Sequence, residues 1–197
     1  MGSTSISTLR RLIARRVIAR GRLTRPPQPL AQSFMYPGGA GMIGPGAERL
    51  LRTVLVDALT NGSERLNVVI ALSDLEQLLG DTSSLPSGRF ASALHVAETL
   101  EDTIEHLESR HPRLGIAGTT PRPATLWLAT PGPDADVVHQ TLEHLPTASI
   151  IALFKGPWPY GPTHLIDTDG PRQLPARDLT LVSRNQAVAS LHVPDTR

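Results

Sequence analysis

The sequence predicts an α/β protein with a mostly parallel sheet flanked by helices, a three-layer sandwich. Strand-like and helix-like patterns alternate along most of the chain, an order typical of parallel sheets with crossover helices. The run from Leu66 to Leu72 is apolar except at Asn67, as expected for a strand that is buried on both faces. A glycine-rich stretch, Gly41 to Glu48, separates a strand-like segment from a long helical pattern. Together these observations predict a layered sheet in which a glycine-rich loop joins a strand to a helix.

The composition fits one such domain. The chain has 197 residues, of which 40% are hydrophobic and 19% charged, enough for one core of ordinary size. It contains no cysteine, which excludes disulfides and thiol chemistry. No run approaches the roughly 20 apolar residues that cross a bilayer, and the polar start lacks the apolar centre of a secretion signal. We therefore expect a cytoplasmic protein.

Residues 1–31 are predicted to form a basic amphipathic helix and a Pro-rich linker, ahead of a single α/β domain over residues 32–197. Residues 1–25 hold seven arginines and no acid, so the remaining chain carries 12 basic (19 − 7) against 18 acidic groups, net −6. Apolar residues recur at helical spacing among these arginines. The candidate binding residues of the segment are Arg10, Arg11, Arg15, Arg16 and Arg20.

Several roles stay open for this basic segment. A basic amphipathic helix binds a protein partner, lies on acidic lipid headgroups at the periphery of a membrane, binds nucleic acid, or docks without a function. Nucleic acid ranks behind a membrane or a partner because the arginines lack the interleaved aromatic residues of a single-strand binder.

The first half of the domain is predicted as follows. A strand-like lead-in over Ser33 to Tyr36 precedes the glycine loop, and a helix follows from Glu48 to Leu59. After the strand at Leu66 to Leu72, Ser73 caps a short helix that Gly80 closes. The later elements are a loop over 81–89, a strand over 93–96, a helix over 100–110 capped by Thr99, a loop over 112–123, a strand over 125–129, a helix over 134–145 and a strand over 149–154.

The end of the chain is predicted to add a C-terminal β-hairpin. Asp169-Gly170 is a strong two-residue turn signal, and the strands on either side of it cover 163–168 and 172–174. The segment 179–182 is expected as one more edge strand. Ser183 is then expected to cap a helix over 186–191.

The glycine loop matches the pattern G-x-x-x-x-G-K-[ST] at Gly41 and Gly46, with a further glycine at Gly44, and departs from it at Ala47 and Glu48. In a working loop the lysine neutralises phosphates and the hydroxyl binds Mg²⁺. Ala47 supplies no charge, and Glu48 places a carboxylate where phosphate oxygens would lie. We therefore expect neither a nucleotide cofactor nor catalysis. The plainer alternative is a flexible turn ahead of a helix.

The histidines, the acidic residues and the aromatic residues are weaker candidates for a functional site. The seven histidines lack zinc-ligand spacing and no cysteine accompanies them, so we expect no metal site. The acidic helix from Glu98 to Glu108 is expected to be a solvated face, or the surface that receives the basic segment. The turn after the last buried strand places Trp158 and Tyr160 at the carboxyl end of the sheet, where open α/β sheets bind ligands. Alternatively, the tryptophan simply fills the core.

Residues 38–193 resemble a soluble domain of actinobacterial multidomain proteins that also carry LysM modules and bacterial transcriptional activator domains. This resemblance implies architecture more than activity. It is carried by Gly44-Pro45-Gly46-Ala47, Asn67-Val68-Val69-Ile70, Asp74-Leu75, Leu78-Leu79-Gly80, Gly156-Pro157-Trp158-Pro159 and Ile166-Asp167-Thr168-Asp169-Gly170.

More distantly, the order of elements resembles the ATPase core of septal DNA translocases of the FtsK type and of type VII secretion motors. Three loop glycines and the helix residues Leu50 to Thr53 match in position. Besides Ala47 and Glu48, the strand Thr125 to Ala129 departs from that family because it lacks the acidic pair that would hold Mg²⁺. The resemblance, with these departures, implies a scaffold without hydrolysis.

The function expected from the sequence is that of a non-catalytic binding or regulatory module. It is expected to contact another protein through the carboxyl edge of the sheet and the arginine-rich segment. A DNA-associated transcriptional regulator is the alternative, and a residual nucleotide-binding or nucleotidase protein is the third.

Overall fold

In the computed structural model, the described residues are 29–61, 66–83, 85–110, 124–146, 149–171 and 179–193. They form a seven-stranded sheet of order β3-β2-β4-β5-β1-β6-β7. All neighbouring strands are parallel except the last pair, so the predicted fold class is confirmed. The strands are β1 (Ala40–Ile43), β2 (Leu66–Ala71), β3 (Leu94–Ala97), β4 (Ala124–Ala129), β5 (Ile150–Lys155), β6 (Thr163–Asp167) and β7 (Gly170–Pro171).

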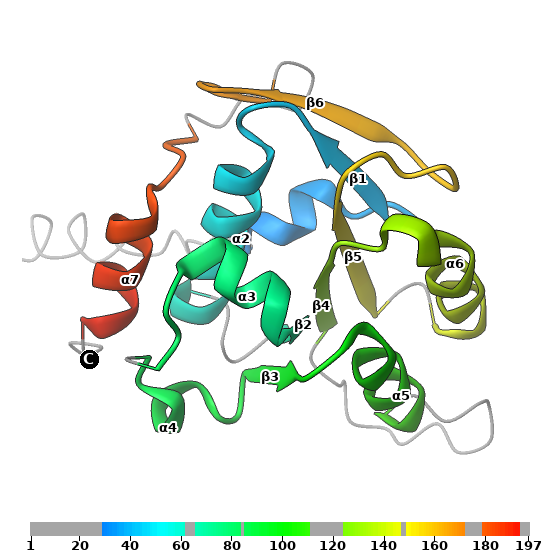
Figure 1. The fold of residues 1–197 in the computed structure, drawn as a ribbon, viewed down its shortest axis with the longest axis horizontal. Helices are drawn as coiled ribbons and strands as arrows, with labels where there is room; N and C mark the ends of the chain where they lie inside the picture. The colour runs from blue at the N-terminus through cyan, green and yellow to red at the C-terminus, as the bar shows by residue number, and fades with distance from the viewer. Residues whose placement is uncertain are drawn as a thin grey trace, which may run out of the picture.

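Helices cover both faces of the sheet (Figure 1). On one face lie α2 (Ala47–Asn61), α3 (Leu72–Leu79) and α7 (Arg184–His192), together with the 3₁₀ helix η1 (Leu30–Phe34). On the other face lie α5 (Leu100–Arg110) and α6 (Ala135–His144). Two short elements, α4 (Ser87–Phe90) and η2 (Gly132–Asp134), connect the layers. The result is a three-layer α/β/α sandwich.

The central strands divide the core into two halves. Successive side chains of a strand point to opposite faces, and in β4 Leu126 and Leu128 join the core under α2, whereas Trp127 and Ala129 join the core under α5 and α6. Because both faces are covered, these strands need apolar residues at nearly every position. This is why the continuous apolar runs predicted β2, β4 and β5 well.

The strand before the glycine loop differs from the prediction. Ser33 and Phe34 end the 3₁₀ helix η1, and the strand begins only at Ala40, so the expected lead-in strand is wrong. A turn at Pro37 and Gly38 intervenes, with positive φ at Gly38 and Gly39. Such a turn ends any extended run that reaches it. Gly41 therefore belongs to β1 and not to the loop.

Several helix ends agree with the prediction and one does not. Thr99 and Asp102 cap α5 reciprocally, Ser183 forms a capping box with Gln186, and Gly80 ends α3. Ser73, by contrast, lies inside α3. The helix starts directly after β2 with Ala71 as its N-cap and without a side-chain cap, so that predicted role of Ser73 is wrong.

Loop regions hold the remaining differences. The segment expected as a loop over 81–89 contains most of α4. The expected strand at 179–182 is absent, and Leu181 is instead buried beside α2, where its carbonyl accepts from Arg49. The hairpin exists, but Asp167 pairs with Gly170, which moves the turn to Thr168-Asp169. The basic helix, the loop over 112–123 and the second hairpin strand over 172–174 lie outside the described residues.

Candidate functional site

At the carboxyl edge of the sheet, several pairs of neighbouring strands lead to opposite faces. The chain leaves β1 and β2 toward the layer of α2 and α3, whereas it leaves β3, β4 and β5 toward the layer of α5, α6 and Trp158. Crevices form at such switch points in open α/β sheets. The pair β5 and β1 is one switch point, and the glycine loop from Gly44 to Gly46 leaves β1 there.

The loop glycines are explained by their contact with strand β6. A β-carbon on Gly46 would lie 1.8 Å from the carbonyl oxygen of Asp167, and one on Gly44, which has φ +95°, would lie 2.6 Å from that of Ile166. The Gly46 N–H donates to the Ile166 carbonyl at 3.0 Å, and the Ala47 N–H donates to the Gly44 carbonyl at 3.2 Å. A phosphate-binding loop keeps such donors for its ligand. Here the N–H groups of Gly46 and Ala47 donate to carbonyls of the protein instead.

Glu48, at the start of α2, lies among three cationic side chains. Its Oε1 is 2.6 Å from Nη2 of Arg52 and 3.7 Å from Nη2 of Arg184, and its Oε2 is 3.6 Å from Nζ of Lys155. These partners come from α2, α7 and β5. The carboxylate that the sequence placed at the phosphate position thus forms ion pairs with cations from three elements of the fold.

Arg52 is the buried member of this cluster, with a side chain only 5% exposed. Its Nε donates to the Leu78 carbonyl and its Nη1 to the Val182 carbonyl at 3.4 Å. Burial lowers the pKa of its guanidinium below the ordinary value for arginine, and the Glu48 carboxylate opposes that shift. A buried charge is tolerated when it is paired and hydrogen-bonded, and Glu48 provides the pairing.

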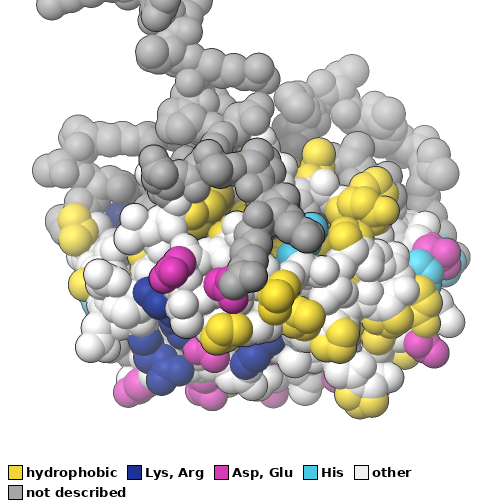
Figure 2. Space-filling view, turned by 90° about the horizontal axis from the view of Figure 1, so that it is seen from above, with side chains coloured by type: hydrophobic (Ala, Val, Ile, Leu, Met, Phe, Trp, Pro, Cys, Tyr) yellow, Lys and Arg dark blue, Asp and Glu magenta, His cyan; other side chains and the backbone are white. Residues whose placement is uncertain are grey.

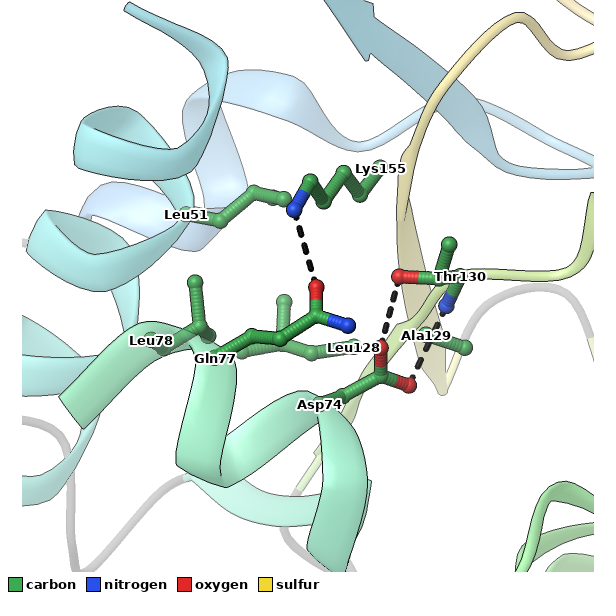
Figure 3. Close-up of a pocket in the computed structure, with 8 residues that line it drawn as sticks. All are labelled: Leu51, Asp74, Gln77, Leu78, Leu128, Ala129, Thr130 and Lys155. Atoms are coloured by element: carbon green, nitrogen blue, oxygen red, sulfur yellow. Dashed lines mark hydrogen bonds between the residues drawn. The ribbon is translucent and has the colours of Figure 1, made fainter. Parts of the chain in front are cut away.

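A shallow hollow lies beside the cluster (Figure 3). The Lys155 ammonium donates to Oε1 of Gln77 at 2.8 Å on one side, and Asp74 accepts from the backbone and hydroxyl of Thr130 on the other. The hollow is partly open to solvent and has room for about one water molecule, far less than a small-molecule site needs. Its lining is Leu51, Asp74, Gln77, Leu78, Leu128, Ala129, Thr130 and Lys155.

The predicted position of Trp158 and Tyr160 at the carboxyl end is wrong. After β5 the chain turns back across the face that α6 covers, and the indole Nε1 of Trp158 donates to the carbonyl of Gly38, which precedes β1. Trp158 is 2% exposed and packs on Phe154 at 4.2 Å between ring centroids. The tryptophan therefore fills the core, which is the alternative that the sequence left open.

Tyr160 lies at the surface of the same connection. Its ring stacks on His139 of α6 at 3.9 Å between centroids, and its hydroxyl donates to Oδ1 of Asp136 at 2.5 Å. The hydrogen bond to that carboxylate raises the pKa of the Tyr160 phenol. These contacts join the connection to α6, away from the glycine loop.

The structure groups the candidate residues differently from the sequence. Gly44, Gly46, Ala47 and Glu48 lie together at the carboxyl edge, whereas Arg10, Arg11, Arg15, Arg16 and Arg20 lie outside the described residues. Sequence reasoning missed Lys155 and Arg184. Lys155 is the sole lysine of the chain and directly follows the strand predicted over 149–154, which was a usable signal. The sequence contains no comparable signal for Arg184, because only tertiary packing brings α7 to the loop.

Neither a metal centre nor a membrane span emerges from the parts of the chain that the structure describes. Within those ranges no three histidine, aspartate or glutamate side chains converge as metal ligands do. No helix among them has the length and apolar character needed to cross a bilayer. No family model, curated protein or solved structure matches this chain.

Proposed function

We propose that this chain is a non-catalytic binding or regulatory module, built on a phosphate-loop-like scaffold, that contacts another protein through the carboxyl edge of its sheet. The observation that carries the proposal is the position of Glu48. Its carboxylate forms ion pairs with Arg52, Lys155 and Arg184, three cations near the loop. The use of the Gly46 N–H by Ile166 supports the same conclusion.

The energetics of the missing lysine support the loss of nucleotide. A charge-assisted hydrogen bond contributes about 1.5–3 kcal/mol, so the change at Ala47 alone weakens nucleotide binding by roughly tenfold to a hundredfold. Glu48 adds repulsion between a carboxylate and the phosphates.

Calorimetric titration of the full chain with Mg-ATP tests this part of the proposal. We expect no saturable heat up to about 1 mM nucleotide, which corresponds to a binding free energy weaker than about −4 kcal/mol. Saturable micromolar binding would overturn it and favour a residual nucleotide-binding protein.

Apolar side chains at the carboxyl edge favour a protein partner. Leu72, which begins α3 directly after β2, is 38% exposed, and Leu165 on β6, next to the glycine loop, is 51% exposed. Figure 2 shows hydrophobic side chains close to acidic and basic ones, with the basic side chains gathered toward the side where α7 lies. Mixed apolar and charged surfaces are typical of non-obligate interfaces.

The proposed contact with another protein is tested by comparing how well variants at the carboxyl edge of the sheet retain a partner. With the protein immobilised, a partner that binds at the carboxyl edge is retained by the wild type and by Met35→Glu, and is lost with Leu72→Glu. Met35 is the matched control because it is an exposed apolar residue that precedes β1 at the other edge. Equal retention by both variants would contradict the proposed surface.

The proposal also includes a cytoplasmic location, with the arginine-rich segment as a second contact to the partner or to an acidic membrane surface.

A further inference from the structure

We infer that Arg52, Lys155 and Arg184 form an oxyanion-binding site that the Glu48 carboxylate fills from within the chain. The inference rests on the proposed function, since it assumes that the loop itself no longer holds a nucleotide. It goes further because it assigns the three cations to a site that binds oxyanions.

Positive charges outnumber negative ones around Glu48. Three cations from α2, β5 and α7 converge on one carboxylate at 2.6, 3.6 and 3.7 Å. Asp74, the other carboxylate that lines the neighbouring hollow, accepts two hydrogen bonds from Thr130. The cluster therefore keeps an excess of positive charge around Glu48, and Arg49 on α2 adds to the field at Arg52.

The cations are also held in place by groups other than Glu48. Arg52 donates to the carbonyls of Leu78 and Val182, and Arg184 donates to the carbonyl of Gln77 at 2.9 Å. Lys155 donates to the Gln77 side chain at 2.8 Å. Carbonyls at the end of a helix attract cations, so α3 positions both arginines. The donors are pre-organised and do not depend on the carboxylate for their direction.

The geometry favours a compact tetrahedral oxyanion. Glu48 offers two oxygens to three cations, and Oε1 is shared between Arg52 and Arg184. A phosphate group supplies an oxygen for each cation and more negative charge than a carboxylate. The hollow beside the cluster has room for about one water molecule and therefore none for a nucleoside. Inorganic phosphate is therefore the appropriate probe.

Glu48→Gln tests the site because it removes the negative charge and keeps the size of the side chain. Without its partner, the buried Arg52 retains an unpaired charge, so phosphate is expected to bind the variant roughly tenfold to a hundredfold more tightly than the wild type. Calorimetry measures the affinity, and a phosphate-dependent rise in Tm reports the same event in a second way. Glu76→Gln, an exposed change on α3 with the same gain in net charge, is the matched control and is expected to behave like the wild type.

Lys155 localises the ligand because it is the only lysine of the chain. An amine-reactive label therefore modifies only Lys155 and the terminal amine, and phosphate is expected to protect Lys155 in Glu48→Gln but not in the wild type. The terminal amine serves as the internal reference, so phosphate bound to the basic segment is distinguished from phosphate at the site. Adding Arg184→Gln to Glu48→Gln is expected to reverse most of the gain.

The inference is overturned if Glu48→Gln binds phosphate no more tightly than the wild type, or if binding leaves the labelling of Lys155 unchanged. Glu48→Ala, which retains helix propensity at that position, repeats the test should the glutamine variant fold poorly. The proposed function fails separately, through Mg-ATP binding by the wild type. The two failures are therefore distinguishable.

Discussion

Gly46 lies so close to strand β6 that a β-carbon on it would sit 1.8 Å from the carbonyl oxygen of Asp167. Gly41, inside β1, is excluded from carrying one by the backbone of Gly156 and Trp158. Phosphate binding also requires glycines at such positions. The same sequence pattern therefore has two physical causes, and in this chain the packing of neighbouring strands accounts for it without a ligand.

Gly46→Ala is expected to lower the free energy of unfolding by about 3 kcal/mol or more, because the contacting atom belongs to a backbone that has little freedom to move. Gly88 is the matched control, since a β-carbon there meets nothing within 4 Å, and Gly88→Ala is expected to change stability by less than about 1 kcal/mol. Chemical denaturation of both variants measures the difference. Similar losses in the two variants would mean that the loop is not packed against β6.

The elements that the sequence predicted well are those whose signals are local. Caps at Thr99 and Ser183 and the stop at Gly80 depend on hydrogen bonds within a few residues. The continuous apolar runs predicted β2, β4 and β5, because burial on both faces removes the usual alternation. Local patterns were therefore sufficient for most helices and for the central strands.

The elements that were mispredicted depend on contacts between distant segments. Leu181 is buried beside α2 and belongs to no strand, and its carbonyl accepts from the Arg49 side chain. The connection after β5 turns back over the sheet, and no local pattern indicates the bond from Trp158 to Gly38. The candidate site divides in the same way. The loop pattern was sufficient to identify Ala47 and Glu48 in the sequence, whereas Arg184 reaches Glu48 only because α7 packs beside α2.

Strand β3 and helix α5 are joined by two stacked imidazoles, which predicts a pH dependence. The rings of His95 and His106 lie 3.4 Å apart at an interplanar angle of 10°. Burial, followed by the charge of Arg110, lowers the pKa of His95 below the unfolded value of 6.5. The unfolded chain then binds more protons than the folded one between these two pKa values, so this group contributes stability above pH 6.5 that is lost as the pH falls through its folded pKa.

His95→Phe keeps an aromatic ring in the stack and removes the titration. Its free energy of unfolding is expected to fall less steeply than that of the wild type as the pH is lowered from about 7.5 to about 5, the interval in which histidines titrate. Denaturant titrations at a series of pH values measure both slopes, and the carboxylate contribution cancels in their difference. Identical slopes would exclude His95 as a source of the dependence.

Charge is distributed over the whole chain as a basic first segment and an acidic remainder. Residues 1–25 carry seven arginines and no acid, and the other residues carry net −6. The described core begins at Leu30, two residues before the predicted start of the domain; Leu30 is buried and its N–H donates to Oδ2 of Asp57 at 2.5 Å. Packing of η1 on α2 therefore belongs to the folded domain, and the arginines precede it.

A chain that lacks residues 1–25 is therefore expected to keep the thermal stability of the full chain, because Leu30 and its contacts remain. Removing residues 1–35 instead deletes buried Leu30 and Phe34, and this truncation is expected to lower the free energy of unfolding by several kcal/mol, at about 1.5–3 kcal/mol for each large apolar side chain.

Duplex DNA distinguishes the proposed module from a DNA-associated regulator. Seven arginines give non-specific binding with a slope of at most about −6 in log affinity against log salt, and a Kd of about 10⁻⁴–10⁻⁶ M at physiological salt. The proposed function predicts this weak affinity without sequence preference, and its complete loss when residues 1–25 are deleted. A Kd near 10⁻⁸ M for a particular duplex lies in the range of specific binding. Because seven phosphate contacts alone do not supply that affinity, such a result would mean that the folded domain reads bases, and the transcriptional alternative would then replace the proposal made here.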